Sequence, residues 1–421
     1  MNYFESEYFT YQNDSLFCEE VPVTQITEKY GTPTYIYSKK FFVDRYNEFN
    51  EAFKDINHKI FYACKSNFNL NIIKTFTNLG SGVDVNSEGE LIRALKTGVS
   101  PNKIIFSGVG KTQEEIKIAI ETKILMLKAE SIEEVHLINK VAESLGKIVS
   151  IALRVNPDVD AETHPYISTG LAENKFGIET GIALELFREN KSLKNIRFAG
   201  IDMHIGSQIT KIGPYLSAVE KLSELYLQVK SEGIPLEHFD IGGGIGISYN
   251  DEKTFSLVDF AESLKPYLKK LNGDIFFEPG RFLTANGGIL SVQVLYTKKN
   301  HDKNFIIVDG AMNDLLRPSI YNAYHHIQPV KKEKDRKTIE TDIVGPVCES
   351  GDFLAKKREF VESHHGEYLA VMSAGAYGMP MASNYNARRR PAEVLVDGNN
   401  FKLIRSRESF NHLLYDEEKY L

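Results

Sequence analysis

The chain has few cysteines and no long apolar run. Its three cysteines, Cys18, Cys64 and Cys348, are too few and too scattered to frame a secreted, disulfide-stabilised fold. Neither C-x-x-C nor H-E-x-x-H occurs, so these zinc motifs are excluded and no metal is expected. No run of 18 apolar residues is present, and the terminus MNYFESEYFT lacks a basic flank followed by an apolar stretch. We therefore expect a cytoplasmic protein that does not bind membranes.

Positive charge is not in excess either. The 421 residues include 50 Lys+Arg and 57 Asp+Glu, which gives a formal net charge of −7. This balance opposes binding to a phosphate backbone, so nucleic acid is not an expected partner. With 42% hydrophobic and 25% charged residues, the composition is that of a globular protein. The length suits several domains, or one large α/β barrel with a smaller companion.

Eight short apolar runs recur with stretches of helical period between them. The runs are continuous rather than alternating, as expected of parallel strands that are buried on both faces. Segments such as EGELIRALKTG and TQEEIKIAIETK have apolar residues at helical spacing. The pattern predicts a (β/α)8 barrel, with an inserted loop, DVDAETHPYISTGLAENKFG, between its fifth and sixth strands. The predicted strands lie near residues 60, 83, 105, 126, 152, 201, 239 and 276.

After about residue 285 the helical period fades. Segments such as GGILSVQVLYTKK, KNFIIVDGAM and FKLIRSRES predict antiparallel strands of a second, β-rich domain. YGTPTYIYS, near the amino terminus, is also strand-like, and we expect it to join that domain. The predicted division is a barrel over 36–285, and a β-sandwich or β-barrel-like domain made from 1–35 and 286–421.

The ends of the predicted barrel strands are polar. In a (β/α)8 barrel, catalytic groups gather at the carboxyl ends of the strands, so residues that close each run are candidates for a site. Any one of them alone is better explained as an incidental strand cap, but so many on one rim favour a site. Six of the eight strands end in this way, at Lys65, Asp84, Arg154, His204, Asp240, and Glu278 with Arg281.

Glycines follow the seventh strand. SGVGKT lacks the first glycine of a P-loop, and DIGGGIGIS lacks the third glycine of a dinucleotide-binding motif, so both of those sites are excluded. The amides of Gly242, Gly243 and Gly244 can still form a phosphate nest, although a tight turn alone also explains them. Ser207, in HIGSQ, adds a hydroxyl donor from the neighbouring strand.

The predicted rim offers the three groups that bind pyridoxal phosphate: a phosphate-binding turn, a lysine and a carboxylate. A partly desolvated lysine loses its proton readily and forms a Schiff base with the cofactor aldehyde; Lys65 is the candidate, with Lys111 and Lys175 as rivals. Glu278 can pair with the pyridine nitrogen and keep it protonated, so that the ring accepts electrons. His204 can stack on the ring, or can be a buried structural histidine.

Longer motifs resemble one family. YACKSNFN, DMHIGSQ, FDIGGGIGISY, FEPGRF, VGPVCESGDFLAK and GAYGMPMASNYNARRRPAEVLV resemble the pyridoxal-phosphate-dependent diaminopimelate decarboxylases of the alanine-racemase-like fold type. The resemblance runs nearly end to end. It implies that Lys65 carries the cofactor and His204 stacks on it. It also implies that the phosphate is held near Ser207 and Gly244, and that the remaining cofactor contacts come from Glu278, Pro279, Gly280, Arg281 and Tyr377.

The resemblance also implies a substrate site, formed by Arg281, Arg317, Tyr321, Glu349 and Tyr377. This set is chemically sensible, because the far end of diaminopimelate is a second amino acid head with a carboxylate and an ammonium. Without the family, RPSIY is equally well explained as a turn, and Glu349 as a surface acid. Cys348 resembles a thiol that comes from the partner subunit and reprotonates the substrate, which implies a homodimer with shared active sites. An inert cysteine is the alternative.

The expected reaction is decarboxylation of meso-diaminopimelate to L-lysine and carbon dioxide, the last step of lysine biosynthesis, with Lys65, His204 and Cys348 as catalytic residues. Small departures from the family, Ser66 and Glu88, remove no chemical group. Two alternatives stay open: a decarboxylase of ornithine, arginine or carboxynorspermidine, and a non-catalytic cofactor-binding regulatory homologue.

Overall fold

The chain divides into two compact units. The computed structural model describes residues 4–161, 163–167, 169–171 and 173–421. The barrel unit comprises Arg45–Ile247 and Lys253–Phe282, and the β unit comprises Met1–Asp44, Ser248–Glu252 and Leu283–Leu421. The division therefore falls inside two helices, α2 (Lys39–Ala52) and α10 (Arg281–Thr284).

Eight parallel strands close the barrel. They follow the order β9-β11-β12-β13-β5-β6-β7-β8, and β8 pairs with β9 to complete the circle. All eight lie where the apolar runs predicted them, so the predicted fold class is confirmed. The strands are β5 (His58–Ala63), β6 (Gly82–Val85), β7 (Ile104–Phe106), β8 (Met126–Ala129), β9 (Val149–Asn156), β11 (Ile196–Asp202), β12 (His238–Asp240) and β13 (Asp274–Phe277).

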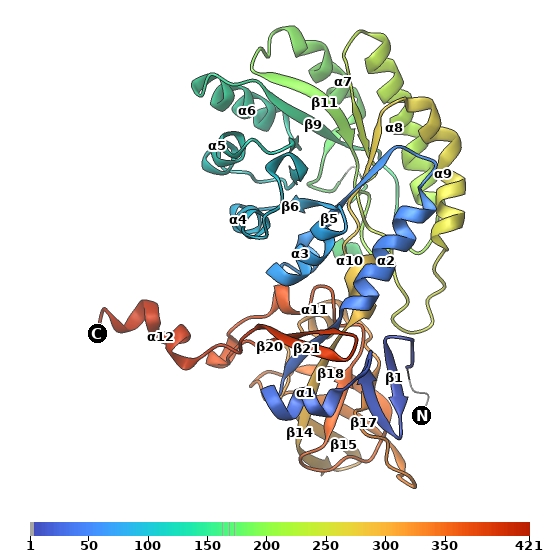
Figure 1. Cartoon of the computed structure of the whole chain (residues 1–421), viewed down its shortest axis with the longest axis vertical. Helices are drawn as coiled ribbons and strands as arrows, with labels where there is room; N and C mark the ends of the chain where they lie inside the picture. The colour runs from blue at the N-terminus through green and yellow to red at the C-terminus, as the bar shows by residue number, and fades with distance from the viewer. Residues whose placement is uncertain (1–3, 162, 168, 172) are drawn as a thin grey trace. The chain divides into compact units, whose positions relative to one another are not determined.

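Helices alternate with these strands and surround them (Figure 1). The helix predicted from TQEEIKIAIETK begins with a capping box, in which the side chains of Thr112 and Glu115 each accept a hydrogen bond from the other's backbone amide. A cap of this kind fixes the residue at which the helix begins. The preceding strand and its loop must therefore end before that residue. The helices are α3 (Leu70–Asn78), α4 (Glu88–Lys96), α5 (Gln113–Thr122), α6 (Ile132–Ser144), α7 (Thr180–Arg188), α8 (Gly213–Ser231) and α9 (Leu257–Leu271).

Apolar side chains fill the middle of the barrel. Phe61 and Phe276 pack with their ring centroids 4.7 Å apart, beside Ile105 and Met126 and the small residues Ala152 and Ala199. Large and small side chains from different strands thus complement one another in a packed layer. Residues two positions along a strand face the same side, so the residues two positions after Met126 and Phe276 lie above this layer, toward the carboxyl ends.

The β unit is built around a mixed sheet. Its strands follow the order β18-β17-β15-β14-β4-β20-β21, and β19 (Tyr368–Val371) pairs with both β14 and β16 (Ile327–Pro329). The strand predicted from YGTPTYIYS is β4 (Thr34–Ser38), which joins this sheet as expected. The other strands are β14 (Gly288–Asn300), β15 (Lys303–Val308), β17 (Thr338–Val344), β18 (Phe353–Val361), β20 (Ala392–Asp397) and β21 (Asn400–Arg405).

The prediction of antiparallel strands holds for most pairs in this unit but not for two of them. The pairs β4–β20 and β15–β17 are parallel. A parallel pair needs a long connection between its strands, and β4 meets its partner only after the chain has passed through the barrel. A smaller sheet precedes β4 and contains β1 (Phe9–Gln12), β2 (Ser15–Cys18) and β3 (Val21–Pro22), followed by α1 (Val23–Tyr30).

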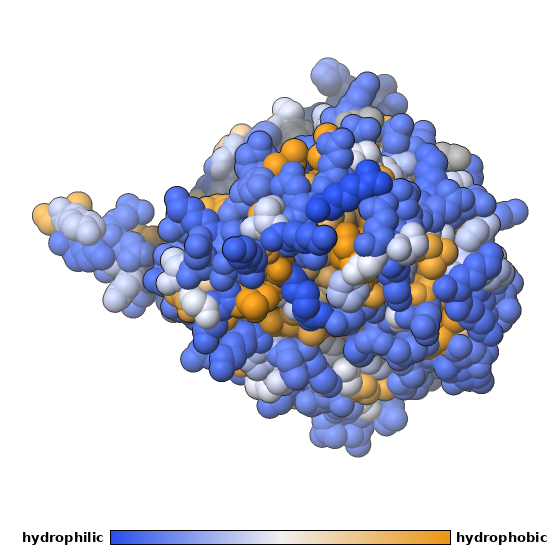
Figure 2. Space-filling model, turned by 90° about the horizontal axis from the view of Figure 1, so that it is seen from above, coloured by the Kyte–Doolittle hydropathy of each residue, from blue (hydrophilic) through white to orange (hydrophobic). Residues whose placement is uncertain are grey.

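The described helices include none that is long and apolar enough to cross a membrane. The last of them, α12 (Phe410–Glu418), has no buried residue. The face of the molecule seen in Figure 2 is mostly hydrophilic, with apolar residues in small groups.

Candidate functional site

Lys65 lies at the carboxyl end of β5. It is the middle residue of a single 3₁₀ turn, Cys64–Ser66, which Ser66 stabilises by donating its hydroxyl to the Ala63 carbonyl at 2.9 Å. The side chain of Lys65 is half-buried. Of its two rivals, Lys111 is buried in an ion pair with Glu134 at 2.7 Å, and Lys175 is exposed.

The three glycines form a tight turn after β12. A Cβ at Gly242, Gly243 or Gly244 would lie 2.2, 2.1 and 2.2 Å, respectively, from a backbone carbonyl oxygen, so no other residue fits without movement. Gly242 and Gly244 also have positive φ angles, of 72° and 96°. The sequence therefore demands glycine here for packing and for conformation.

The predicted nest of three amides needs a correction. The Gly242 amide donates to Asp240 Oδ1 at 2.8 Å, and the Gly243 amide donates to His204 Nδ1 at 3.2 Å. These two amides are thus used inside the protein and shape the turn. Among the described residues, the Gly244 amide is the one of the three for which no such bond is present.

His204 follows β11, and hydrogen bonds fix both its ring and its backbone carbonyl. Its ring accepts the Gly243 amide at Nδ1, so a neutral ring carries its proton at Nε2. Its carbonyl accepts hydrogen bonds from Arg154 at 3.2 Å and from Thr169 at 2.7 Å. Burial lowers the pKa of His204 well below its ordinary value, and the positive charges of Lys65 and Arg154 lower it further. The ring is therefore neutral at physiological pH.

Arg281 and Ser207 lie together beside the glycine turn. A guanidinium nitrogen of Arg281 donates to the Ser207 hydroxyl at 2.9 Å. Arg281 is buried and opens the short helix α10, directly after Pro279 and Gly280. The Pro279 carbonyl accepts the Ala63 amide at 3.3 Å, which ties the FEPGR segment to the strand that precedes Lys65. The structure thus brings the predicted cofactor residues of the barrel unit to one rim.

Glu278 belongs to a buried cluster around Lys128, a residue that the strand-end pattern does not identify. Fully buried Lys128 donates to Asp202 at 2.7 Å, to Asp240 at 2.5 Å, and to Glu278. Oxygen atoms of these three carboxylates lie within 4.8 Å of one another. Burial raises the pKa of Glu278 well above its ordinary value, with Asp240 and Asp84 adding to the shift and Lys128 opposing it. The signal in the sequence was a lysine inside the apolar run ILMLKAES.

The predicted inserted loop, 158–177, leads back to the same rim. Residues 162, 168 and 172 of it lie outside the described residues. In the described part, Gly177 donates its amide to Glu130 at 3.2 Å, and Glu130 also forms a buried ion pair with Arg154 at 3.0 Å. Arg154 thus connects the loop to the His204 carbonyl.

The predicted substrate residues Arg317, Tyr321 and Glu349 lie in the β unit, as do Tyr377 and Cys348. Arg317 is buried at the start of α11 (Arg317–Tyr321), and it donates to His325 Nε2 at 2.8 Å. Its guanidinium also lies 4.4 Å from the centroid of the Tyr249 ring.

The remaining residues of this set are more open. Tyr321 and Tyr377 are half-buried, whereas Cys348 and Glu349 are exposed. Cys348 is placed by its amide, which donates to Asn386 Oδ1 at 3.0 Å. Exposure of Cys348 in a single chain argues against an inert cysteine packed in a core.

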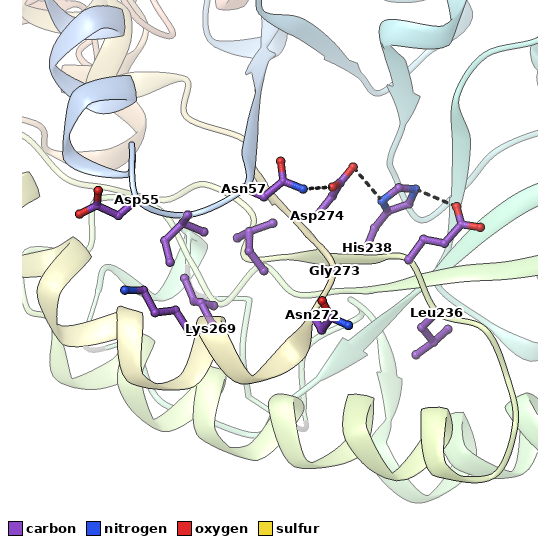
Figure 3. A pocket seen from close by; sticks show the side chains of 12 residues that line it. Asp55, Asn57, Leu236, His238, Lys269, Asn272, Gly273 and Asp274 are labelled. Carbon is purple, nitrogen blue, oxygen red and sulfur yellow. Dashed lines mark hydrogen bonds and ion pairs between the residues drawn. The ribbon is translucent and has the colours of Figure 1, made fainter.

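A hollow of about 550 Å³ lies at the opposite end of the barrel. Asn57, His238 and Asp274 line it at the amino ends of three strands, and in Figure 3 Asn57 donates a hydrogen bond to Asp274, which also faces the His238 ring. Asp274 pairs with Lys59 at 2.5 Å, and Asp55 with Lys265 at 3.2 Å. Polar groups at the amino ends of barrel strands belong to the end that supports stability rather than chemistry.

Comparisons with known proteins agree with the geometry. The family model "Pyridoxal-dependent decarboxylase, pyridoxal binding domain" matches residues 40–285. The diaminopimelate decarboxylase of Aquifex aeolicus is 47% identical over 408 residues, which cover 97% of this chain and 96% of that protein.

Solved structures give the same result. Diaminopimelate decarboxylase from Helicobacter pylori, complexed with L-lysine, has a TM-score of 0.91 and 41% identity, covering 94% of this chain and 100% of that one. The enzyme from M. jannaschii, also in complex with L-lysine, has a TM-score of 0.92 and 36% identity, covering 98% of both chains. The resemblance inferred from the motifs is confirmed: the chain belongs to the diaminopimelate decarboxylase family of pyridoxal-dependent decarboxylases.

Proposed function

We propose that this protein decarboxylates meso-diaminopimelate to L-lysine and carbon dioxide with pyridoxal 5′-phosphate as cofactor. The observation that carries the proposal is the near full-length identity, 47% over 97% of the chain, to a diaminopimelate decarboxylase. Solved relatives that bind L-lysine, the expected product, support the same substrate class.

The residues at the barrel rim fit the cofactor. Lys65 supplies an amine for its aldehyde, and Glu278 a carboxylate for its ring nitrogen. Ser207, held by Arg281, and the amide of Gly244 supply donors for its phosphate. The clearance at Gly244 matters here, since the Gly206 carbonyl leaves no room for a side chain at that point of the turn. This set has the chemistry that pyridoxal phosphate requires.

Bound pyridoxal phosphate supplies an electron sink for the pair of electrons that remains at Cα when carbon dioxide leaves. Glu278 holds a proton at the ring nitrogen. His204 is neutral, and its ring is fixed by the Gly243 amide, so it can lie against the cofactor ring without adding a charge that competes with Glu278. Lys65 binds the cofactor and releases the product.

The β unit supplies the residues for substrate and proton. Arg317, oriented by His325 and Tyr249, and Arg281 are candidates for the distal carboxylate, and Glu349 is the candidate for the distal ammonium. Tyr321 and Tyr377 contribute hydroxyls to the same substrate. Cys348 delivers a proton to Cα of the substrate after decarboxylation.

A homodimer with shared active sites is part of the proposal. Cys348 and Glu349 are adjacent and both are exposed in the single chain, so a partner subunit can reach both side chains. Each subunit would then contribute Cys348 to the site of its partner. A cytoplasmic location also remains a prediction, supported by three cysteines that are all free thiols.

Turnover on two substrates tests the function. The purified protein should release carbon dioxide from meso-diaminopimelate at a kcat/KM at least about 10³-fold above that for ornithine. A site built to bind polar groups rejects analogues that lack them by on the order of 10⁴-fold, so a preference of about 10³-fold is a conservative expectation. Equal or better turnover of ornithine would identify a decarboxylase of another basic amino acid. No turnover of either substrate, with cofactor bound, would identify a non-catalytic homologue.

A further inference from the structure

Lys128 crosses the barrel interior. It lies on β8, and its ammonium reaches carboxylates at the ends of β11, β12 and β13, none of which is a neighbour of β8 in the sheet. Since Lys128 follows Met126 by two residues, it faces the interior, one layer above the packed core. A lysine buried this completely is rare unless it is paired.

Stability does not account for this arrangement. Removing an ammonium and three carboxylates from water is costly, and a buried charge cluster is often no more stable than apolar residues of the same volume. The charges also do not balance, because one cation faces three acids. A cluster with surplus negative charge suits a site that receives another positive group.

Glu278 is the member of the cluster that the proposed function uses. Charged groups face it from several strands: Asp84, Lys128, Asp202 and Asp240. The three acids favour its protonated form, and Lys128 alone among these four favours its ionised form. A protonated Glu278 could form only a neutral hydrogen bond with a pyridine nitrogen, which is roughly half as strong as a charge-assisted one.

We propose that Lys128 is a positioning residue that shifts Glu278 toward its ionised form when the carboxyl group pairs with the ring nitrogen of the cofactor. The inference rests on the proposed function, in which Glu278 meets that nitrogen. Lys128 itself contacts neither cofactor nor substrate in this scheme and acts through Glu278.

An analogue of the cofactor provides the test. We suggest pyridoxal phosphate and its analogue with C–H in place of the ring nitrogen, both titrated into the full-length apoprotein. The analogue keeps the aldehyde and the phosphate. Lys65 and the glycine turn therefore contribute equally to the binding of both ligands, and their contributions cancel in the ratio of the two dissociation constants. That ratio reports the ring nitrogen alone, and it requires no catalytic activity.

The native protein should bind pyridoxal phosphate at least about tenfold more tightly than the analogue, the ratio that corresponds to one charge-assisted hydrogen bond. Lys128→Met should reduce this preference to about threefold or less, as should Glu278→Gln. Adding Lys128→Met to Glu278→Gln should reduce it no further. The matched control is Lys111→Met, which removes a buried, ion-paired lysine elsewhere in the barrel unit and should leave the preference unchanged.

A Lys128→Met protein that binds both ligands more weakly by the same factor would show a merely structural role and overturn the inference. A native protein without any preference would instead contradict the pairing of Glu278 with the ring nitrogen, and with it this part of the proposed function. If Lys128→Met does not fold, Lys128→Met/Asp202→Asn removes one charge of each sign, and the same loss of preference is expected. An unchanged preference in that folded double variant would overturn the inference.

Discussion

At the carboxyl ends of the barrel strands, one buried ammonium lies among three buried carboxylates, whereas at the amino ends acids pair with lysines near the surface. Asp274 pairs there with Lys59, and Asp55 with Lys265, all partly exposed to solvent. Exposed pairs contribute about 0–1 kcal/mol each. Charged residues at the carboxyl ends of the strands therefore serve the chemistry, whereas those at the amino ends only stabilise the fold slightly.

The two ends of β5 provide the largest expected difference. Lys65→Ala should lower kcat/KM for meso-diaminopimelate by a factor on the order of 10³ or more, because the amine that binds the cofactor is lost. Carbon dioxide release measures it. Lys59→Ala, at the amino end of the strand, removes a partly exposed ion pair and a contact with the Phe276 ring, and should stay within about twofold of the native rate. Comparable losses in both variants would show that the two ends of β5 do not differ in function.

The next contrast uses the two ends of β13. Glu278→Gln should lower kcat by about 10²-fold, since preorganised charge at a reacting centre is worth this much in other enzymes. Asp274→Asn should leave kcat unchanged and cost less than about 1 kcal/mol in the free energy of unfolding. Steady-state kinetics and denaturant titration separate the two effects. A Glu278→Gln enzyme with native kcat would show that the cluster at the carboxyl ends takes no part in the mechanism.

Gly243→Ala tests the glycine turn. Its Cβ would lie 2.1 Å from the Glu278 carbonyl oxygen, so the substitution should cost about 1–3 kcal/mol of stability. It should also weaken cofactor binding, because the displaced turn carries Gly244. Thermal unfolding of the apoprotein and cofactor titration measure both. Gly213→Ala, where a Cβ would meet nothing within 4 Å, is the control and should be within about 0.5 kcal/mol of native.

The smallest expected effect concerns two histidines, His204 at the carboxyl end and His238 at the amino end. Burial lowers the pKa of each below its ordinary value of 6.5. The unfolded chain therefore binds more protons than the folded one once the pH falls through about 6.5, and stability declines, by at most about 1.4 kcal/mol per pH unit for each group.

Replacing either histidine with Gln should flatten this decline, as followed by denaturant titration between pH 7.5 and 5. The two variants should differ in cofactor affinity, which only His204→Gln weakens. A pH-independent difference in stability between the variants and the native protein would contradict the assignment of neutral, buried rings.

The barrel and its active rim could be predicted because both follow from local patterns. Continuous apolar runs identify parallel strands, and the topology of a (β/α)8 barrel places every strand end on one rim. Lys65, His204 and Glu278 were therefore found as strand-end residues, before any family was considered.

Other features depend on contacts between distant residues. A continuous apolar run does not reveal which of its side chains face the interior, so Lys128 could not be assigned to the cluster. The directions of the Gly242 and Gly243 amides are set by Asp240 and His204. The parallel pairing of β4 with β20 joins residues from opposite ends of the chain, which local patterns do not encode.

The most direct test of the account is to locate the cofactor covalently. Borohydride reduction of the purified holoprotein, followed by peptide mapping, should place the pyridoxyl label on Lys65 in the segment YACKSN. A label on Lys111, Lys128 or Lys175, or no label on a protein that nevertheless decarboxylates meso-diaminopimelate, would contradict the central assignment.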